Sequence, residues 1–189
     1  MGIISLITPK KTAAIVDGSG FATLRTFTFF DQITRYINGF SNQFIHLSLG
    51  TTQDIGGANG TAHYIDWDTE DTKDTGFTHS TTTNPSRIQV DATARYSIRF
   101  AVSGTQGGAA RTTLMSSLRV DGTTAVLRGR QRNYSRGSAY GDISLLHYTE
   151  LDLTSGQYIE AVVTVDDTDG AYAINTINAE CEMIVRRIG

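Results

Sequence analysis

Cysteine is nearly absent from this sequence of 189 residues, in which Cys181 is the only one. A single cysteine excludes an intrachain disulfide and a cage of thiolates around a metal, so packing must hold the fold together. Proline is also scarce, with two residues. No apolar run approaches the roughly 20 residues of a membrane-spanning helix, so we expect no membrane partner.

An excess of positive charge is also missing. The formal net charge is −3 and the isoelectric point is about 5.7, whereas a dedicated nucleic-acid binder normally carries a basic stripe and a high isoelectric point. We therefore expect no nucleic-acid ligand. The first apolar patch ends at Pro9 and Lys10, which is too short for a secretory signal, so export by the Sec route is not expected.

What is present first is an unusual N-terminal region. Residues 1–15 read as an extended arm, and residues 26–38 show the only helical pattern, with apolar residues three and four apart before Asn38-Gly39. One interpretation is a helix that caps the domain, and the other, which we favour, is an anchor that docks on another chain. The candidate anchor residues are Ile3, Ile4, Leu6, Phe27, Phe29, Phe30, Ile33, Tyr36 and Ile37.

The rest of the chain alternates with period two between turn signals, as β-strands do. The predicted strands are residues 62–67, 87–90, 94–102, 113–120, 124–129, 143–153, 158–165 and 179–188. Several short strands without interleaved helices are typical of a sandwich of two sheets. We therefore predict an all-β protein of about eight to ten antiparallel strands, with an N-terminal anchor at residues 1–55 and a knob at residues 56–189.

Some predicted strands carry apolar residues on both faces, as residues 159–165 do. Such a strand is expected to have the sandwich core on one side and a second subunit on the other. The candidate core and subunit-contact residues are Tyr96, Ile98, Phe100, Ile159, Val163 and Ile184.

Three segments in the second half carry a resemblance. Residues 94–102 (ARYSIRFAV) resemble the G-x-Y-x-(I/F)-x-F-x-V strand of the tumour-necrosis-factor and complement globular-head superfamily. Residues 118–123 (LRVDGT) are similar to its L-x-V-N-G hairpin, and residues 151–160 (LDLTSGQYIE) to its L-x-L-x-x-G-D-x-I/V hairpin. Ala94 replaces the usual glycine, and Gln157 the usual aspartate. The resemblance implies a jelly-roll β-sandwich that forms a homotrimer through apolar faces, without catalysis.

The N-terminal region has a separate resemblance. Residues 7–9, 16–23 and 29–35 resemble the opening segment of small bacteriophage virion proteins, where a D-x-x-G-x-x-T turn precedes a short helix. The expected function is a non-enzymatic virion structural protein: a trimeric capsid decoration, cement or head-fibre protein, made in the host cytoplasm and bound to the major capsid or another virion protein by its arm. The alternative is a tail-fibre or receptor-binding knob that contacts a host glycan or surface protein.

Two acidic groups are candidate cation sites, although both also read as ordinary solvated loops. Oxygen-rich clusters can hold calcium, and the candidates are Asp66, Asp68, Glu70, Asp166, Asp167 and Asp169. The first group fails the EF-hand template, so no cofactor is expected beyond such a cation.

A candidate ligand face follows from alternating arginines. In a strand Arg128, Arg130 and Arg132 share one face, with Tyr134 and Arg136 just beyond. Planar guanidinium groups can grip acidic protein, phosphate or glycan, and the competing interpretation is an exposed face paired with acidic neighbours. Trp67, Tyr134 and Tyr140 are candidates for a sugar-stacking platform or for packing.

No catalytic motif stands out. The four histidines, His46, His63, His79 and His147, lack metal-ligand spacing, and no Gly-x-Ser-x-Gly elbow occurs. We therefore expect no enzymatic activity.

Overall fold

The computed structural model describes residues 43–107, 111–135, 141–168, 170 and 173–188. The described residues all belong to one compact unit, Asn42–Gly189. The predicted arm, the predicted helix and all the candidate anchor residues lie outside them.

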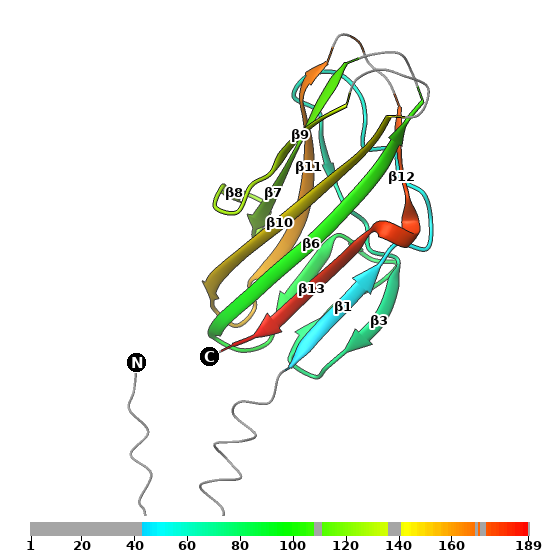
Figure 1. The fold of residues 1–189 in the computed structure, drawn as a ribbon. Helices are drawn as coiled ribbons and strands as arrows, with labels where there is room; N and C mark the ends of the chain where they lie inside the picture. The colour runs from blue at the N-terminus through cyan, green and yellow to red at the C-terminus, as the bar shows by residue number, and fades with distance from the viewer. Residues whose placement is uncertain (1–42, 108–110, 136–140, 169, 171–172, 189) are drawn as a thin grey trace, which may run out of the picture. The chain divides into compact units, whose positions relative to one another are not determined.

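The described part of the chain forms two antiparallel sheets (Figure 1). The six-stranded sheet has the order β10-β6-β13-β1-β3, with β12 also paired to β6. Its strands are β1 (Phe44–Ser48), β3 (Thr69–Lys73), β6 (Ala94–Gln106), β10 (Gly141–Leu153), β12 (Ile174–Thr176) and β13 (Glu182–Arg187). A 3-10 turn, η1 (Asn178–Glu180), precedes β13.

The seven-stranded sheet has the order β4-β5-β11-β7-β8, with β2 paired to β11 and β9 to β7. Its strands are β2 (Ala62–Tyr64), β4 (Phe77–Thr78), β5 (Arg87–Val90), β7 (Thr112–Val120), β8 (Thr124–Val126), β9 (Arg132–Ser135) and β11 (Tyr158–Thr168). The β7–β8 hairpin turns at Asp121 and Gly122, whose φ angles of 51° and 70° are left-handed, a conformation that aspartate tolerates and glycine favours.

The core lies between the sheets and follows from the alternation of side chains. Along β6, Tyr96, Ile98, Phe100 and Val102 are each at most 1% exposed, while the residues between them face outward. Opposite them, β11 contributes Ile159, Ala161, Val163 and Val165, all at 0% exposure. The predicted all-β sandwich is therefore confirmed.

One expectation about β11 is wrong. Its outward-facing Val162 is 0% exposed and Glu160 is 3% exposed within this single chain. Tyr64 of β2 pairs with Val162, and Ser117 of β7 lies beside it on the other side. Because neighbouring strands already shield this face of β11, no second subunit is needed to cover it.

The boundary of the sandwich lies earlier than the sequence suggests. β1 is hydrogen-bonded between β13 and β3, and Ile55 is a core residue at 1% exposure. Residues 44–55, which we assigned to the anchor, thus belong to the sandwich. Among the described residues, no helix has the length and apolar character required to cross a membrane.

Candidate functional site

The outward face of the six-stranded sheet carries most of the exposed apolar side chains that the structure describes. Leu146 and Tyr148 of β10 are 48% and 51% exposed, and Ile188, just after β13, is 39% exposed. Leu146 and Tyr148 are exposed because side chains on β10 alternate between the two faces of the sheet, and His147 and Thr149 point into the core. We call this surface the β10–β3 face. It contains a hollow of about 420 Å³ lined by Ser97, Arg99, Tyr148, Glu150, Ile184, Arg186 and Ile188.

Charged side chains of both signs lie between these apolar groups. Arg95 Nη2 is 3.0 Å from Glu150 Oε2, and Glu150 Oε1 accepts a hydrogen bond of 3.1 Å from the Tyr148 hydroxyl. Further along the face, Arg99 Nη2 donates to Glu182 Oε1 at 2.5 Å. Each carboxylate thus has a basic partner within the chain, so burying the face would not bury an isolated charge.

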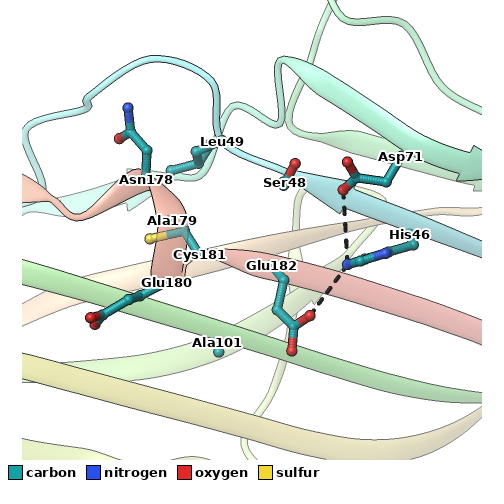
Figure 2. A pocket seen from close by; sticks show the side chains of 10 residues that line it. All are labelled: His46, Ser48, Leu49, Asp71, Ala101, Asn178, Ala179, Glu180, Cys181 and Glu182. Carbon is teal, nitrogen blue, oxygen red and sulfur yellow. Dashed lines mark ion pairs between the residues drawn. The ribbon is translucent and has the colours of Figure 1, made fainter.

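Figure 2 shows a second hollow at the β1–β3 end of the same face. His46 projects from β1 between Asp71 of β3 and Glu182 of β13, with Nε2 at 3.8 Å from Asp71 Oδ2 and 3.2 Å from Glu182 Oε2. The hollow measures about 460 Å³. Three chain segments distant in sequence therefore converge on one imidazole.

The thiol that lines this second hollow is buried. This thiol, Cys181, is 2% exposed and donates towards the carbonyls of Ser103 and Ile177. Burial raises the pKa of Cys181, so the reactive thiolate is disfavoured. His46 has two carboxylate neighbours, an arrangement that holds a side chain in place on a surface.

The candidate cation ligands are distributed over separate hydrogen-bond networks. Asp68 ties down a loop by accepting from the backbone amides of Gly50 and Thr51. Although burial tends to raise the pKa of Asp68, hydrogen bonds from Thr51 and Gly50 lower it overall.

The remaining acidic candidates have other roles. Glu70 accepts from Lys73 Nζ at 2.7 Å and contacts His79 Nδ1 at 2.9 Å, and Asp166 accepts from Arg132. Asp66 lies in the connection between β2 and β3, Asp167 lies on β11 opposite Thr113, and Asp169 lies outside the described residues. Within the part of the chain that the structure describes, no group of three His, Cys, Asp or Glu is placed to hold a metal ion.

The predicted row of arginines on one strand is wrong. Gly129, with φ at 79°, turns the chain between β8 and β9, and the Arg130 amide donates to the Leu127 carbonyl. Arg128 and Arg130 therefore lie in a turn and only Arg132 lies on β9, where Asp166 pairs with it. Arg136 lies outside the described residues, and Tyr134 is 47% exposed on β9.

Of the two interpretations given for the aromatic residues Trp67, Tyr134 and Tyr140, Trp67 follows the packing one. Trp67 is 0% exposed in the core, and Tyr140 lies outside the described residues. Since a sugar-stacking ring must present a face to solvent, Trp67 belongs to packing.

The candidate core and contact residues separate into two groups. Tyr96, Ile98, Phe100, Ile159 and Val163 lie in the core, whereas Ile184 is half-buried on the β10–β3 face. Leu146, Tyr148 and His46 were not predicted as members of that face. For β10 the signal was present, because Leu146 and Tyr148 alternate with the inward-facing positions of a predicted strand.

Comparisons with known proteins agree on the fold alone. No protein-family model matches this chain, and no curated protein matches it. Among solved structures, the Eiger TNF of S. frugiperda aligns with a TM-score of 0.52 and 11% identity, over 78% of this chain and 93% of that one. Murine APRIL at pH 5.0 aligns with a TM-score of 0.51 and 10% identity, over 78% of this chain and 99% of that one. The sandwich is therefore a jelly roll of the tumour-necrosis-factor type.

Proposed function

We propose that this chain is a non-enzymatic structural subunit that assembles as a homotrimer through the β10–β3 face, and that its N-terminal region anchors the trimer to a bacteriophage virion as a decoration, cement or head-fibre protein. The observation that carries the self-assembly is the β10–β3 face itself. Its exposed Leu146, Tyr148 and Ile188 are large apolar groups on a sheet face that nothing covers among the described residues.

The chemistry of the face favours sister copies as the occupants. Alternating arginines and glutamates are paired on the surface, so the face is electrostatically self-complementary. Burying apolar area at about 25 cal/mol per Å² stabilises such an interface, and closed symmetric assemblies use the same patch in every copy. The jelly-roll fold agrees with this arrangement, and the virion context rests on the N-terminal resemblance.

Among the residues that the structure describes, the two groups closest to a nucleophile and a base are both buried, which supports a structural role over an enzymatic one. The buried thiol of Cys181 has a raised pKa, and His147 lies in the core at 0% exposure. A catalytic site instead needs a nucleophile and a base that meet in an open cleft.

Two tyrosines give a matched test of the assembly face. Tyr148→Lys places a charge on the β10–β3 face, while Tyr134→Lys places it on β9 of the other sheet at nearly equal exposure, 51% against 47%. Light scattering should give three times the 20.5 kDa chain mass for the parent and Tyr134→Lys, and a smaller mass for Tyr148→Lys. Equal masses for the two variants would contradict the assignment of the face.

The virion role has its own test. Removing residues 1–39 should leave a trimer that no longer joins phage particles when the particles are purified and probed for this chain. Incorporation at the level of the full chain would refute the anchor.

A further inference from the structure

A second surface, on the outward face of the seven-stranded sheet, has the features of a small-ligand site. Two adjoining hollows of about 350 Å³ and 210 Å³ share Asn84 and Arg87. Together they reach the lower part of the range of about 300–1,000 Å³ that is typical of small-molecule sites. We call this surface the Glu160 hollow.

The floor of the Glu160 hollow is a buried carboxylate with one free oxygen. The Glu160 side chain is 4% exposed. Its Oε1 accepts from Ser86 Oγ at 3.1 Å and from Arg87 Nε at 3.2 Å. Its Oε2 lies beside Gly122, and no described residue donates a hydrogen bond to it.

Further polar groups in the hollow lack partners among the described residues. Arg87 uses only Nε on Glu160, so its two Nη groups have no hydrogen bond there. The Asn84 side-chain amide is likewise unpaired, while its backbone carbonyl accepts from the Arg87 amide. The Glu160 Oε2 acceptor, the Arg87 Nη donors and the Asn84 side-chain amide therefore line the same space.

Two tyrosine rings line this space. The Arg87 guanidinium lies 4.5 Å from the centre of the Tyr158 ring, and the Arg119 guanidinium lies 5.2 Å from that of Tyr64. Arg119 also donates to the Tyr64 hydroxyl and to the Gly122 carbonyl at 3.4 Å. Because a guanidinium holds each ring, both are preorganised, which reduces the entropic cost of binding.

The charges select the class of ligand. An anion would meet the buried Glu160 carboxylate, whose charge also helps, after burial, to raise the pKa of Asp66. A cation would meet Arg87, which lines both hollows. A neutral hydroxyl group avoids both conflicts, since it can donate to Glu160 Oε2 and accept from Arg87 Nη at once.

We propose that the Glu160 hollow is a binding site for a neutral saccharide. Sugar hydroxyls supply the donors and acceptors that Glu160, Arg87 and Asn84 lack, and the apolar faces of a pyranose pack on tyrosine rings. The site lies on the sheet opposite the β10–β3 face, so it does not depend on the trimer.

Saturation-transfer NMR on the full chain tests the proposal. The probes are glucose, galactose, mannose, N-acetylglucosamine, lactose and maltose as neutral sugars, with glucosamine as a cation and N-acetylneuraminic acid as an anion. Concentrations up to about 20 mM exceed the millimolar dissociation constants of weak sites. Saturation should pass from the protein to at least one neutral sugar, and that sugar should bind more tightly than both charged probes.

Two variants locate the site. Glu160→Gln should weaken binding of that sugar by about tenfold or more, as expected for losing a hydrogen bond to a charged group. The matched control, Glu150→Gln, changes another arginine-paired glutamate on the opposite sheet and should leave binding unchanged. If Glu160→Gln fails to fold by circular dichroism, Asn84→Gly decides, because the φ of 51° at Asn84 suits glycine.

The proposal is overturned if no neutral sugar binds, if a charged probe binds more tightly, or if the deciding variant binds like the parent. Light scattering of the same samples measures the mass of the assembly, and so tests the trimer separately from sugar binding. If sugar binding is absent while the trimer mass is retained, only the proposal for the Glu160 hollow is refuted.

Discussion

His147 should make the protein sensitive to acid in a way that one substitution removes. The imidazole is 0% exposed and stacks on Phe100, with ring centres 5.1 Å apart and planes 4° from parallel. Burial lowers the pKa of His147 from 6.5 to about 4, and the nearby Arg128 backbone opposes this shift in part. Neither ring nitrogen makes a hydrogen bond with a described residue.

The sign of the effect follows from linkage. Because the folded pKa lies below the unfolded one, the unfolded chain binds the proton first as the pH falls. At least one pH unit above 6.5, the imidazole is almost entirely neutral in both states and has almost no effect on stability. Between about pH 7.5 and pH 5 this one group should remove about 2 kcal/mol from the free energy of unfolding, and about 3 kcal/mol below pH 4.

Urea unfolding at about pH 7.5 and about pH 5, at one protein concentration, measures this loss in the free energy of unfolding. The parent should lose about 2 kcal/mol more than His147→Phe, which keeps an aromatic ring against Phe100, because carboxylate titrations contribute equally to both. His63→Gln, which retains His147, should behave like the parent. An equal pH dependence in the parent and in His147→Phe would refute the reasoning.

Two further predictions concern the turn at Gly129 and the thiol of Cys181. At Gly129 a Cβ would clash with the Tyr148 carbonyl oxygen, whereas at Gly60, also left-handed, it would meet nothing within 4 Å. Gly129→Ala should therefore cost at least about 2 kcal/mol in urea unfolding and Gly60→Ala only about 1 kcal/mol, and equal costs would contradict this account. Iodoacetamide at neutral pH should leave Cys181 unmodified in the folded protein and alkylate it in urea, because the thiol is 2% exposed with a raised pKa. Rapid alkylation of the folded protein would count against its buried position.

The strands with strong alternation were predictable from sequence. β5, β6 and β10 bury about one side chain in two against the core, which produces the pattern directly. β11 instead appears as an apolar run, because the five consecutive residues 159–163 are all buried. β3 was missed because its sequence, TEDTK, lies at a sheet edge and buries no side chain. β12 was missed because it has only three residues. β3 and β12 form because they pair with strands that are distant in sequence, and a local pattern does not encode such pairing.

The surfaces were less predictable. Arg128 and Arg130 alternate in sequence as a strand would, yet Gly129 between them has a left-handed φ and lies in the turn between β8 and β9. The Glu160 hollow did leave a signal, since Glu160 is the one charged residue within the apolar run 159–165. Its partners Ser86 and Arg87 lie more than seventy residues away in the sequence. The pairing of β5 with β11 brings them to Glu160, so the sequence alone did not assemble the site.

Sedimentation equilibrium of the full chain tests most directly whether sister copies cover the β10–β3 face. The account predicts one species of three chain masses, maintained on dilution into the micromolar range. A single species of one chain mass would contradict it, because Leu146, Tyr148 and Ile188 would then remain open to water.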